Sequence, residues 1–298
     1  MGDAPVSRGR RIGAYGSAAF SILIWGATPA ATQIAAAEID PFTTGLLRTV
    51  LAAVVTLPLA ALAGLPRPAN GREWKLLALS ALGGFIGFTL LFNVAVPMTT
   101  TAHAALVIAS APIFTGSIAA IVERRMPLPH WWIGVTIALA GEALLIGVRS
   151  GLEGKPGALA GDLLCLAAIV IATGGYVAGS RLTKSIGTWS TTFWAIGLAG
   201  VVQLPLVGVV LDKTDWAAVS ALGWSAMLYL SLLSTILGYV GWYWALSVGG
   251  IVRMAPLQFS QPLVALAIAP LLFDERITLP LLLSAAAIIG GIAIASRR

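Results

Sequence analysis

The chain has 298 residues, of which 58% are hydrophobic and 10% charged, and its mean hydropathy is +0.92. A soluble domain carries about 25% charged residues, so the composition excludes a soluble enzyme, a disordered chain and a fold stapled by disulfides. The net charge of +6 would indicate nucleic-acid binding in a soluble protein, but in a membrane protein it indicates basic loops, because Lys and Arg collect on the cytoplasmic side.

Apolar runs recur at the length that crosses a bilayer, about 20 residues for an α-helix. In chain order they predict ten membrane helices, at residues 12–37, 41–63, 76–98, 103–122, 129–148, 163–183, 189–211, 224–247, 254–273 and 277–296. Asp40 before Pro41 has the form of a helix cap and first position, and Gly249 with Gly250 is suited to end the eighth helix. Charges at 212–215 indicate a loop, and residues 216–222 belong either to that loop or to a helix at the membrane interface.

The distribution of basic residues predicts the orientation. If the amino terminus is cytoplasmic, the inside segments hold the Lys and Arg at positions 8, 10, 11, 67, 72, 75, 124, 125, 181, 184, 253, 297 and 298, whereas the outside loops hold only those at 149, 155, 213 and 276. This bias places both termini in the cytoplasm. In a bacterial cell, the protein is then a multi-pass protein of the inner membrane.

The sequence contains an internal repeat. Residues 79–92, LSALGGFIGFTLLF, align with residues 230–243, LSLLSTILGYVGWY, at an offset of 151, and Pro112 aligns with Pro262 at an offset of 150. We therefore expect an all-α polytopic membrane protein built from two five-helix repeats, residues 1–150 and 151–298. Because five is odd, the second repeat is inverted relative to the first, as in many secondary transporters, whose substrate lies near the midplane between the repeats.

The chain resembles the drug/metabolite transporter superfamily, EamA type. The segments that carry the resemblance are WGATPAATQIA from Trp25, the stretch from Pro41 to Arg48, TAHAALVIASAPIF ending at Phe114, GDLLCLAA from Gly161, GYVGWYWAL from Gly238 and QPLVALAIAPLLFDERI ending at Ile277. The resemblance implies a cavity lined by helices 1–4 and 6–9, peripheral helices 5 and 10, and export of metabolites. An aromatic amino acid exporter is the closest functional type.

Two departures from the family pattern limit what the resemblance says about the substrate. The first repeat has Arg125 thirteen residues after Pro112, where the second has Glu275 thirteen residues after Pro262. The sixth span has residues 172–175, ATGG, where such repeats often carry a tryptophan.

The candidate substrate-binding residues are aromatic and amide side chains within apolar spans: Trp25, Phe88, Asn93, Tyr176, Tyr239, Tyr243, Gln258 and Gln261. The pairs Phe88 with Phe92 and Tyr239 with Tyr243 have the i, i+4 spacing that places both rings on one helix face. An unpaired amide in hydrocarbon costs several kcal/mol, so the amides are expected to face protein or water. The alternatives are helix packing for the aromatic rings and interhelical hydrogen bonds for the amides.

Prolines and charges inside the spans are further candidates. Pro29, Pro112 and Pro262 each remove a backbone hydrogen bond, so each marks either a static bend or a hinge. Arg48 and Glu142 are buried charges at similar depth, about 10 Å from the outer face at 1.5 Å per residue. Each is expected to have a polar partner, and each is a candidate partner for the other. Six tryptophans are expected in the interfacial belts, at positions 74, 131, 132, 189, 216 and 224.

These patterns predict a secondary transporter that exports aromatic or large neutral amino acids by alternating access. The alternatives are an exporter of drugs, nucleosides or other metabolites, or a channel. An enzyme is not expected, because the sequence has no HExxH or GxSxG motif and no pair of intramembrane aspartates. With one cysteine and two histidines, neither a metal site nor a cofactor is expected. The expected partners are a small-molecule substrate and the lipid bilayer, without nucleic acid. Proton antiport and facilitated diffusion both remain open.

Overall fold

The computed structural model describes residues 7–95, 98, 111–124, 126–150, 158–261, 263–264, 279–295 and 297. These residues are almost entirely helical and include no β-strand, in agreement with the expected all-α fold. Within them, five helical stretches are long and apolar enough to cross a membrane: Pro41–Leu62, Gly71–Phe92, Leu159–Ile186, Thr188–Lys213 and Ala221–Gly249. The count of ten helices stays a prediction, because parts of the fourth and ninth predicted spans lie outside the described residues.

The first half of the chain forms α1 (Arg8–Ala36), α2 (Pro41–Leu62), α3 (Gly71–Ala81), the π-helix η1 (Leu82–Gly87), α4 (Phe88–Ala95), α6 (Ala111–Glu123) and α7 (Pro129–Ser150). The cap predicted for the second helix is present, since the Asp40 carboxylate accepts a hydrogen bond from the Thr43 amide at 2.8 Å and Pro41 opens α2. The elements α3, η1 and α4 follow one another without a break and form one helical run, residues 71–95.

The second half forms α8 (Ala158–Ile186), α9 (Thr188–Val210), the 3₁₀ turn η3 (Leu211–Lys213), α10 (Ala221–Leu228), the π-helix η4 (Tyr229–Leu237), α11 (Gly238–Gly249), α12 (Ile251–Met254), the 3₁₀ helix η5 (Ala255–Ser260) and α14 (Leu279–Ala295). Gly250 follows α11 with a φ of 87°, which ends this helix as predicted. The interfacial helix considered for residues 216–222 is not formed, because this stretch is turn and loop up to Ser220, the cap of α10.

The π-helices of the two halves lie at equivalent positions of the sequence repeat. At the offset of 151, the last turn of η4 aligns with η1, so both helical runs, 71–95 and 221–249, change hydrogen-bonding pattern near their middle. π-Helical turns are rare and occur frequently at functional sites. Sequence reasoning missed both of them, although each contains a pair of small residues in an otherwise apolar span, Gly83–Gly84 and Ser234–Thr235.

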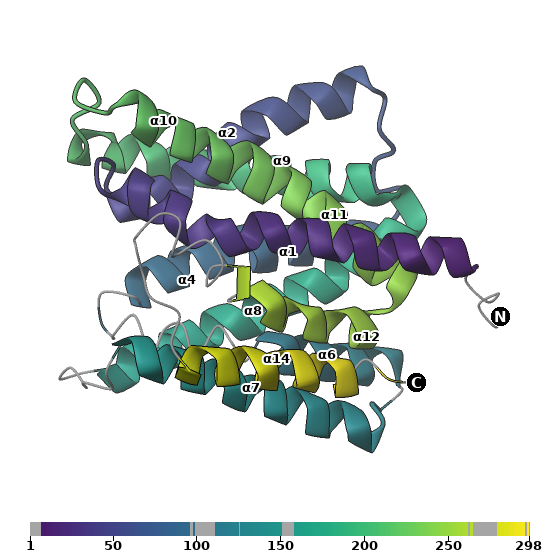
Figure 1. The fold of residues 1–298 in the computed structure, drawn as a ribbon. Coiled ribbons are helices and arrows are strands. Elements are labelled where there is room, and N and C mark those ends of the chain that lie inside the picture. Colours follow the sequence, from purple (N-terminus) through teal and green to yellow (C-terminus); the bar gives the residue numbers. More distant parts are fainter. Residues whose placement is uncertain are drawn as a thin grey trace.

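The helices pair across the two halves of the chain. α7 packs against α14, α2 against α9, and α1 against α11. Figure 1 shows α7 and α14 side by side along one flank of the helix stack, which agrees with the peripheral position implied for the fifth and tenth helices. α1 crosses the middle of the same view and packs against α10, η4 and α11 of the second half, and Trp25 of this helix is buried.

One predicted belt tryptophan is part of the core instead. Trp74 and Trp189 are 51% and 50% exposed, as expected at a membrane interface. Trp131 is only 2% exposed, and its indole N–H donates to the carbonyl of Val252 at 2.9 Å. Its ring fits against Gly116, where a Cβ would collide with the indole. The belt assignment of Trp131 is therefore wrong, because a small residue on α6 opens a socket that the ring fills.

Prolines within helices are more numerous than the three predicted hinge residues. Pro29 lies within the unbroken α1, Pro112 is the second residue of α6, and Pro262 lies outside the described residues. Pro58 and Pro205 also lie inside helices, and each comes 17 residues after the first residue of its helix, α2 or α9. Whether any of the five acts as a hinge stays a prediction.

Candidate substrate site

An aromatic cluster joins the two halves of the chain, formed by Trp25 of α1, Tyr176 of α8 and Tyr239 of α11. The rings of Trp25 and Tyr176 are stacked, with centroids 6.3 Å apart and an interplanar angle of 18°. Tyr239 approaches Trp25 edge-on, with ring centroids 5.2 Å apart, and is tilted relative to Tyr176, with centroids 5.9 Å apart. Three of the predicted site residues therefore meet in space. Trp25 and Tyr239 are buried, whereas Tyr176 is partly exposed as a residue.

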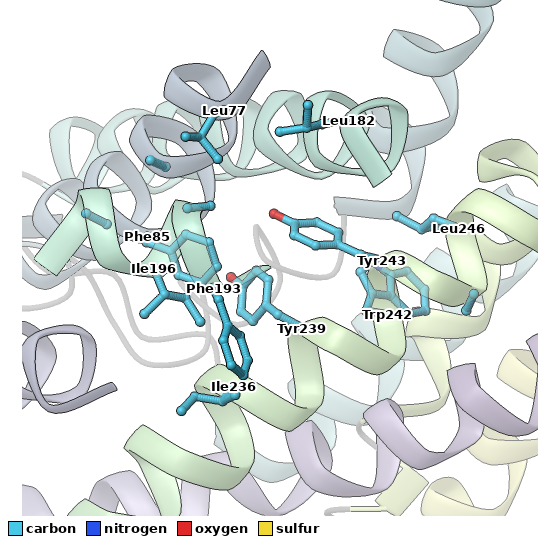
Figure 2. Packing of buried hydrophobic residues seen from close by; sticks show 14 of the residues in the cluster. Leu77, Phe85, Leu182, Phe193, Ile196, Ile236, Tyr239, Trp242, Tyr243 and Leu246 are labelled. Carbon is cyan, nitrogen blue, oxygen red and sulfur yellow. The ribbon is translucent and has the colours of Figure 1, made fainter. Parts of the chain in front are cut away.

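Two tyrosine hydroxyls of α11 fasten this helix to the first half. Tyr239 donates to the carbonyl of Gly84 in η1 at 3.0 Å, and the hydroxyl of Tyr243 lies 2.8 Å from that of Ser80 in α3. Figure 2 shows both rings projecting from α11 into the core that also contains Phe85. Tyr243 is fully buried in this structure. Its ring therefore holds the halves together here and does not face an accessible site.

A polar cluster lies beside the aromatic cluster, around the π-helix η4. The Nε of Arg48 donates to the Thr235 hydroxyl at 3.0 Å, and its Nη2 donates to the Ser234 hydroxyl at 3.1 Å. The Ser234 hydroxyl also lies 2.9 Å from that of Thr28, and the Ser234 carbonyl accepts from the Trp25 indole at 2.9 Å. Arg48 thus has polar partners, as an intramembrane charge requires.

Glu142, considered as a partner for Arg48, belongs to another part of the fold. It lies in α7, which packs against α14 and η5, whereas α2 packs against α9 and η4. The side chain of Glu142 lies outside the described residues. Hydroxyl groups, rather than a carboxylate, hold the guanidinium of Arg48 among the residues that the structure describes.

The remaining predicted site residues do not join the aromatic cluster. Phe88 stacks on Phe92 within α4, with ring centroids 5.1 Å apart. Asn93 lies in the same helix, and its side chain is outside the described part of the chain. Gln258 in η5 is 8% exposed, and its Oε1 has no hydrogen-bond partner among the described residues. Gln261 is partly buried, and its carbonyl lies against Gly26 of α1.

Sequence reasoning missed several polar residues that organise the site. Ser234 and Thr235 bind the guanidinium, and the Thr28 hydroxyl is hydrogen-bonded to that of Ser234. Gln203 of α9 donates from Nε2 to the carbonyl of Phe85 in η1 at 2.9 Å. A signal was present, because the aligned repeat segments read GG in one copy and ST in the other. Two adjacent hydroxyl residues in mid-span need partners in an apolar medium.

An open hollow of about 610 Å³ lies away from both clusters. Its mostly apolar lining comes from α2, η3, the loop after η3 and α10: Leu47, Leu51, Leu211, Asp212, Trp216 and Trp224. The indole N–H of Trp216 donates to the carbonyl of Leu211 at 2.7 Å, which anchors the loop locally. This apolar, open surface suits lipid contact, since Trp rings gather at the level of the headgroups.

A hydrogen-bonded contact joins the two halves at the end of the stack opposite to the start of α1. The carboxylate of Glu38, in the loop after α1, accepts from the amide of Ser220 at 2.6 Å and from its hydroxyl at 2.7 Å. These hydrogen bonds lower the pKa of Glu38 below its ordinary value. Nearby, the Asp40 amide donates to the Thr214 hydroxyl at 3.2 Å. The contact between Glu38 and Ser220 is called the Glu38 latch below.

Comparison with known proteins identifies the family. The model of the EamA-like transporter family matches the chain twice, over residues 13–147 and 159–297. The chain belongs to the EamA-like transporter family. It is 30% identical over 256 residues to the uncharacterized transporter YdeK of Bacillus subtilis (strain 168), covering 86% of this chain and 87% of YdeK. This family consists of membrane transporters, which supports a role other than that of an enzyme.

Two further similarities concern the substrate and the fold. A probable amino-acid metabolite efflux pump of Escherichia coli (strain K12) is 29% identical over 154 residues, which cover 48% of this EamA-like transporter and 50% of the pump. A solved crystal structure superposes with a TM-score of 0.81 at 20% sequence identity, covering 96% of this chain and 97% of the other. At that identity the structural likeness shows the fold alone.

Proposed function

We propose that this EamA-like transporter exports aromatic or large neutral amino acids by alternating access. The observation that carries the proposal is the aromatic cluster of Trp25, Tyr176 and Tyr239, which combines helices of both halves. Aromatic rings in offset or edge-to-face contact gain about 0.5–1.5 kcal/mol beyond the burial of their surface. The ring of Tyr176, a partly exposed residue, is thus a suitable platform for the side chain of an aromatic amino acid.

The proposed transport cycle moves one repeat against the other. Residues 1–150 and 151–298 form the inverted repeats, and the site between them opens alternately to each side of the membrane. Both termini lie in the cytoplasm in this arrangement. Its support is the basic-residue bias of the loops, together with Figure 1, where the start of α1 and the end of α14 lie at the same end of the stack. In a bacterial cell the membrane is the inner membrane. Pro29, Pro112 and Pro262 are the proposed hinges.

The amide residues supply the polar part of the proposed site. The Oε1 of Gln258 is a buried acceptor without a partner among the described residues, and an ammonium group is a fitting donor for it. Gln261 lies one helical turn further along the chain, and Asn93 contributes from the first half. Phe88 extends the apolar lining on α4. Tyr243 acts as a clamp whose bond to Ser80 closes the structure in this conformation.

Counterflow in proteoliposomes tests the proposal. Vesicles that contain the purified protein and are loaded with unlabelled L-phenylalanine are expected to take up labelled L-tryptophan saturably. Tyr176→Leu is expected to lower this uptake about tenfold, the equivalent of about 1.4 kcal/mol. Tyr15→Leu removes a partly buried tyrosine of α1 outside the cluster, and it is expected to retain the uptake.

The same assay separates the alternatives. Unsaturable flux without counterflow contradicts a carrier and indicates a channel. Saturable transport of nucleosides or drugs, without competition by aromatic amino acids, contradicts the proposed substrate class. Equal uptake by Tyr176→Leu and the unmodified protein contradicts the proposed site.

A further inference from the structure

The positive charge of Arg48 is the unusual feature of the polar cluster. A charged side chain near the middle of a membrane helix is costly to insert, and such residues mark binding sites or ion pathways by default. Ser234 and Thr235, its two partners, are the fourteenth and fifteenth residues of the 29-residue span Ala221–Gly249. The guanidinium therefore lies at the midpoint of that span.

The hydroxyl partners leave most of the guanidinium unused. A guanidinium has five N–H donors, and the hydrogen bonds to Ser234 and Thr235 use one on Nε and one on Nη2. Within the part of the chain that the structure describes, no protein acceptor takes the remaining three. Hydroxyl groups also carry no negative charge, so the charge of Arg48 is solvated but not neutralised.

The guanidinium borders the aromatic cluster. Ser234 connects the two groups directly, since its hydroxyl accepts from Arg48 and its carbonyl accepts from the indole of Trp25. A molecule whose ring rests on the aromatic cluster thus places its polar end within reach of Arg48.

We propose that Arg48 is the receptor for the carboxylate of the transported molecule. The two hydroxyls fix the guanidinium plane through one edge, and the free edge presents parallel N–H groups, the geometry that binds a carboxylate in a bidentate manner. The bound anion neutralises the charge that the protein leaves uncompensated. The transporter accordingly distinguishes acids from the corresponding amines and amides. This inference rests on the proposed function for the identity of the substrate, but the charge of Arg48 makes it testable with other aromatic acids.

The preference for acids is tested by measuring the affinity of the purified protein in nanodiscs for four indole ligands: L-tryptophan, indole-3-propionate, L-tryptophanamide and tryptamine. The first two carry a carboxylate and the last two do not. The unmodified protein is expected to bind indole-3-propionate about tenfold more tightly than tryptamine, because hydrogen bonds to charged groups contribute more than neutral ones. Arg48→Met is expected to abolish this preference by weakening the acids about tenfold while tryptamine binding stays within about twofold.

Two further variants distinguish carboxylate binding by Arg48 from a purely structural role of its hydrogen bonds between helices. Ser234→Ala removes a hydroxyl partner but keeps the charge, so the preference for acids is expected to persist. Arg72→Gln removes an exposed cation at the start of α3 and is expected to change nothing. If Arg48→Met does not fold, the unmodified protein still decides, because equal affinity for indole-3-propionate and tryptamine overturns the inference.

The outcomes distinguish this inference from the proposed function. Transport of tryptophan with an Arg48→Met variant that still prefers acids overturns the role of Arg48 and leaves the function standing. Binding of indole-3-propionate that depends on Arg48, without transport of any amino acid, supports the anion receptor and contradicts the amino acid substrate. Equal weakening of acids and amines in Arg48→Met assigns the residue to structure alone.

Discussion

The helical runs 71–95 and 221–249 are the same element of the repeat, yet they carry different chemistry at the same place. Both open into a π-helix near the middle. In the first run the aligned pair is Gly83–Gly84, and in the second it is Ser234–Thr235. The glycines expose backbone, whereas the serine and threonine supply hydroxyls to Arg48. The fold is therefore repeated, but the polar cluster is built only once among the described residues.

The contacts made by each run explain the difference. The glycines of η1 let α8 approach until backbones touch, since a Cβ on Gly83 would meet the backbone of Ile171 and Gly175. The carbonyls of Gly84 and Phe85 then accept from Tyr239 and Gln203. The first run thus serves helix packing. The second run has side chains at these positions, and they form hydrogen bonds with Arg48 in the polar cluster.

Placing the serine of the second run at the aligned position of the first is expected to cause the largest loss of stability. Gly83→Ser introduces the residue of the second run, but its Cβ would lie 2.8 Å from the Cα of Gly175 and even closer to the carbonyl oxygen of Ile171. Overpacking of this kind costs about 3 kcal/mol, because rigid backbone cannot yield. Thermal unfolding in detergent measures the loss. Gly174→Ala is the control, as nothing lies within 4 Å of its Cβ. Equal stability of the two variants would contradict the packing role of η1.

Removal of one side-chain donor to η1 is expected to have an intermediate effect. Gln203→Leu deletes the buried hydrogen bond to the carbonyl of Phe85. This carbonyl keeps the Thr89 hydroxyl as a donor at 2.9 Å, so the expected loss is that of one hydrogen bond, about 1 kcal/mol. Chemical unfolding in detergent checks this value. The control Val202→Ala alters the adjacent residue, which is 50% exposed, and is expected to be nearly neutral. A loss in Gln203→Leu no larger than that of the control would show that η1 does not need the donor from Gln203.

The caps of the two runs extend the comparison to their first turns. Asn70 and Ser220 align at an offset of 150, and each side chain accepts from the amide three residues later, that of Glu73 or Gly223. In the first run Glu73 also binds back to the Ala69 amide at 2.7 Å. In the second run the aligned residue is Gly223, which has no carboxylate. Glu38 occupies the space beside it, since a Cβ added to Gly223 would lie 2.6 Å from Oε2 of Glu38.

The Glu38 latch is expected to give the smallest effect and a defined pH dependence. Because the pKa of Glu38 is lowered in the folded protein, its contribution to stability is present above the unfolded pKa and is lost as the pH falls through the folded pKa. The melting temperature of the unmodified protein is therefore expected to exceed that of Glu38→Gln at neutral pH. The difference should vanish in acid. A difference that is independent of pH would show that the charge of Glu38 has no part in the latch.

The sequence was sufficient for the parts of the fold that depend on one segment at a time. Apolar runs located the helices, and the cap at Asp40 and the end at Gly250 follow from local backbone chemistry. The π-helices were not predicted, and neither was the socket of Trp131, which depends on Gly116 of another helix. Trp25, Tyr176 and Tyr239 were chosen for their depth in the membrane. Ser234, which accepts from Trp25 and Arg48, and Thr235, which accepts from Arg48, were missed. Hydroxyl residues are common in membrane helices for packing reasons alone.

The contact between α7 and α14 joins the two halves of the chain along one flank of the molecule. Gly134 and Gly291 bring the two backbones together so tightly that neither position has space for a methyl group. α7 comes from the first half and α14 from the second, so this glycine seam ties the halves backbone to backbone, with Val135 and Ile288 packed in the same cluster. On the opposite flank α2 packs against α9, and there Gly200 and Gly197 lie against the side chains of Ala53 and Leu57. Relative displacement of the halves is therefore expected to be least at the glycine seam and to grow with distance from it.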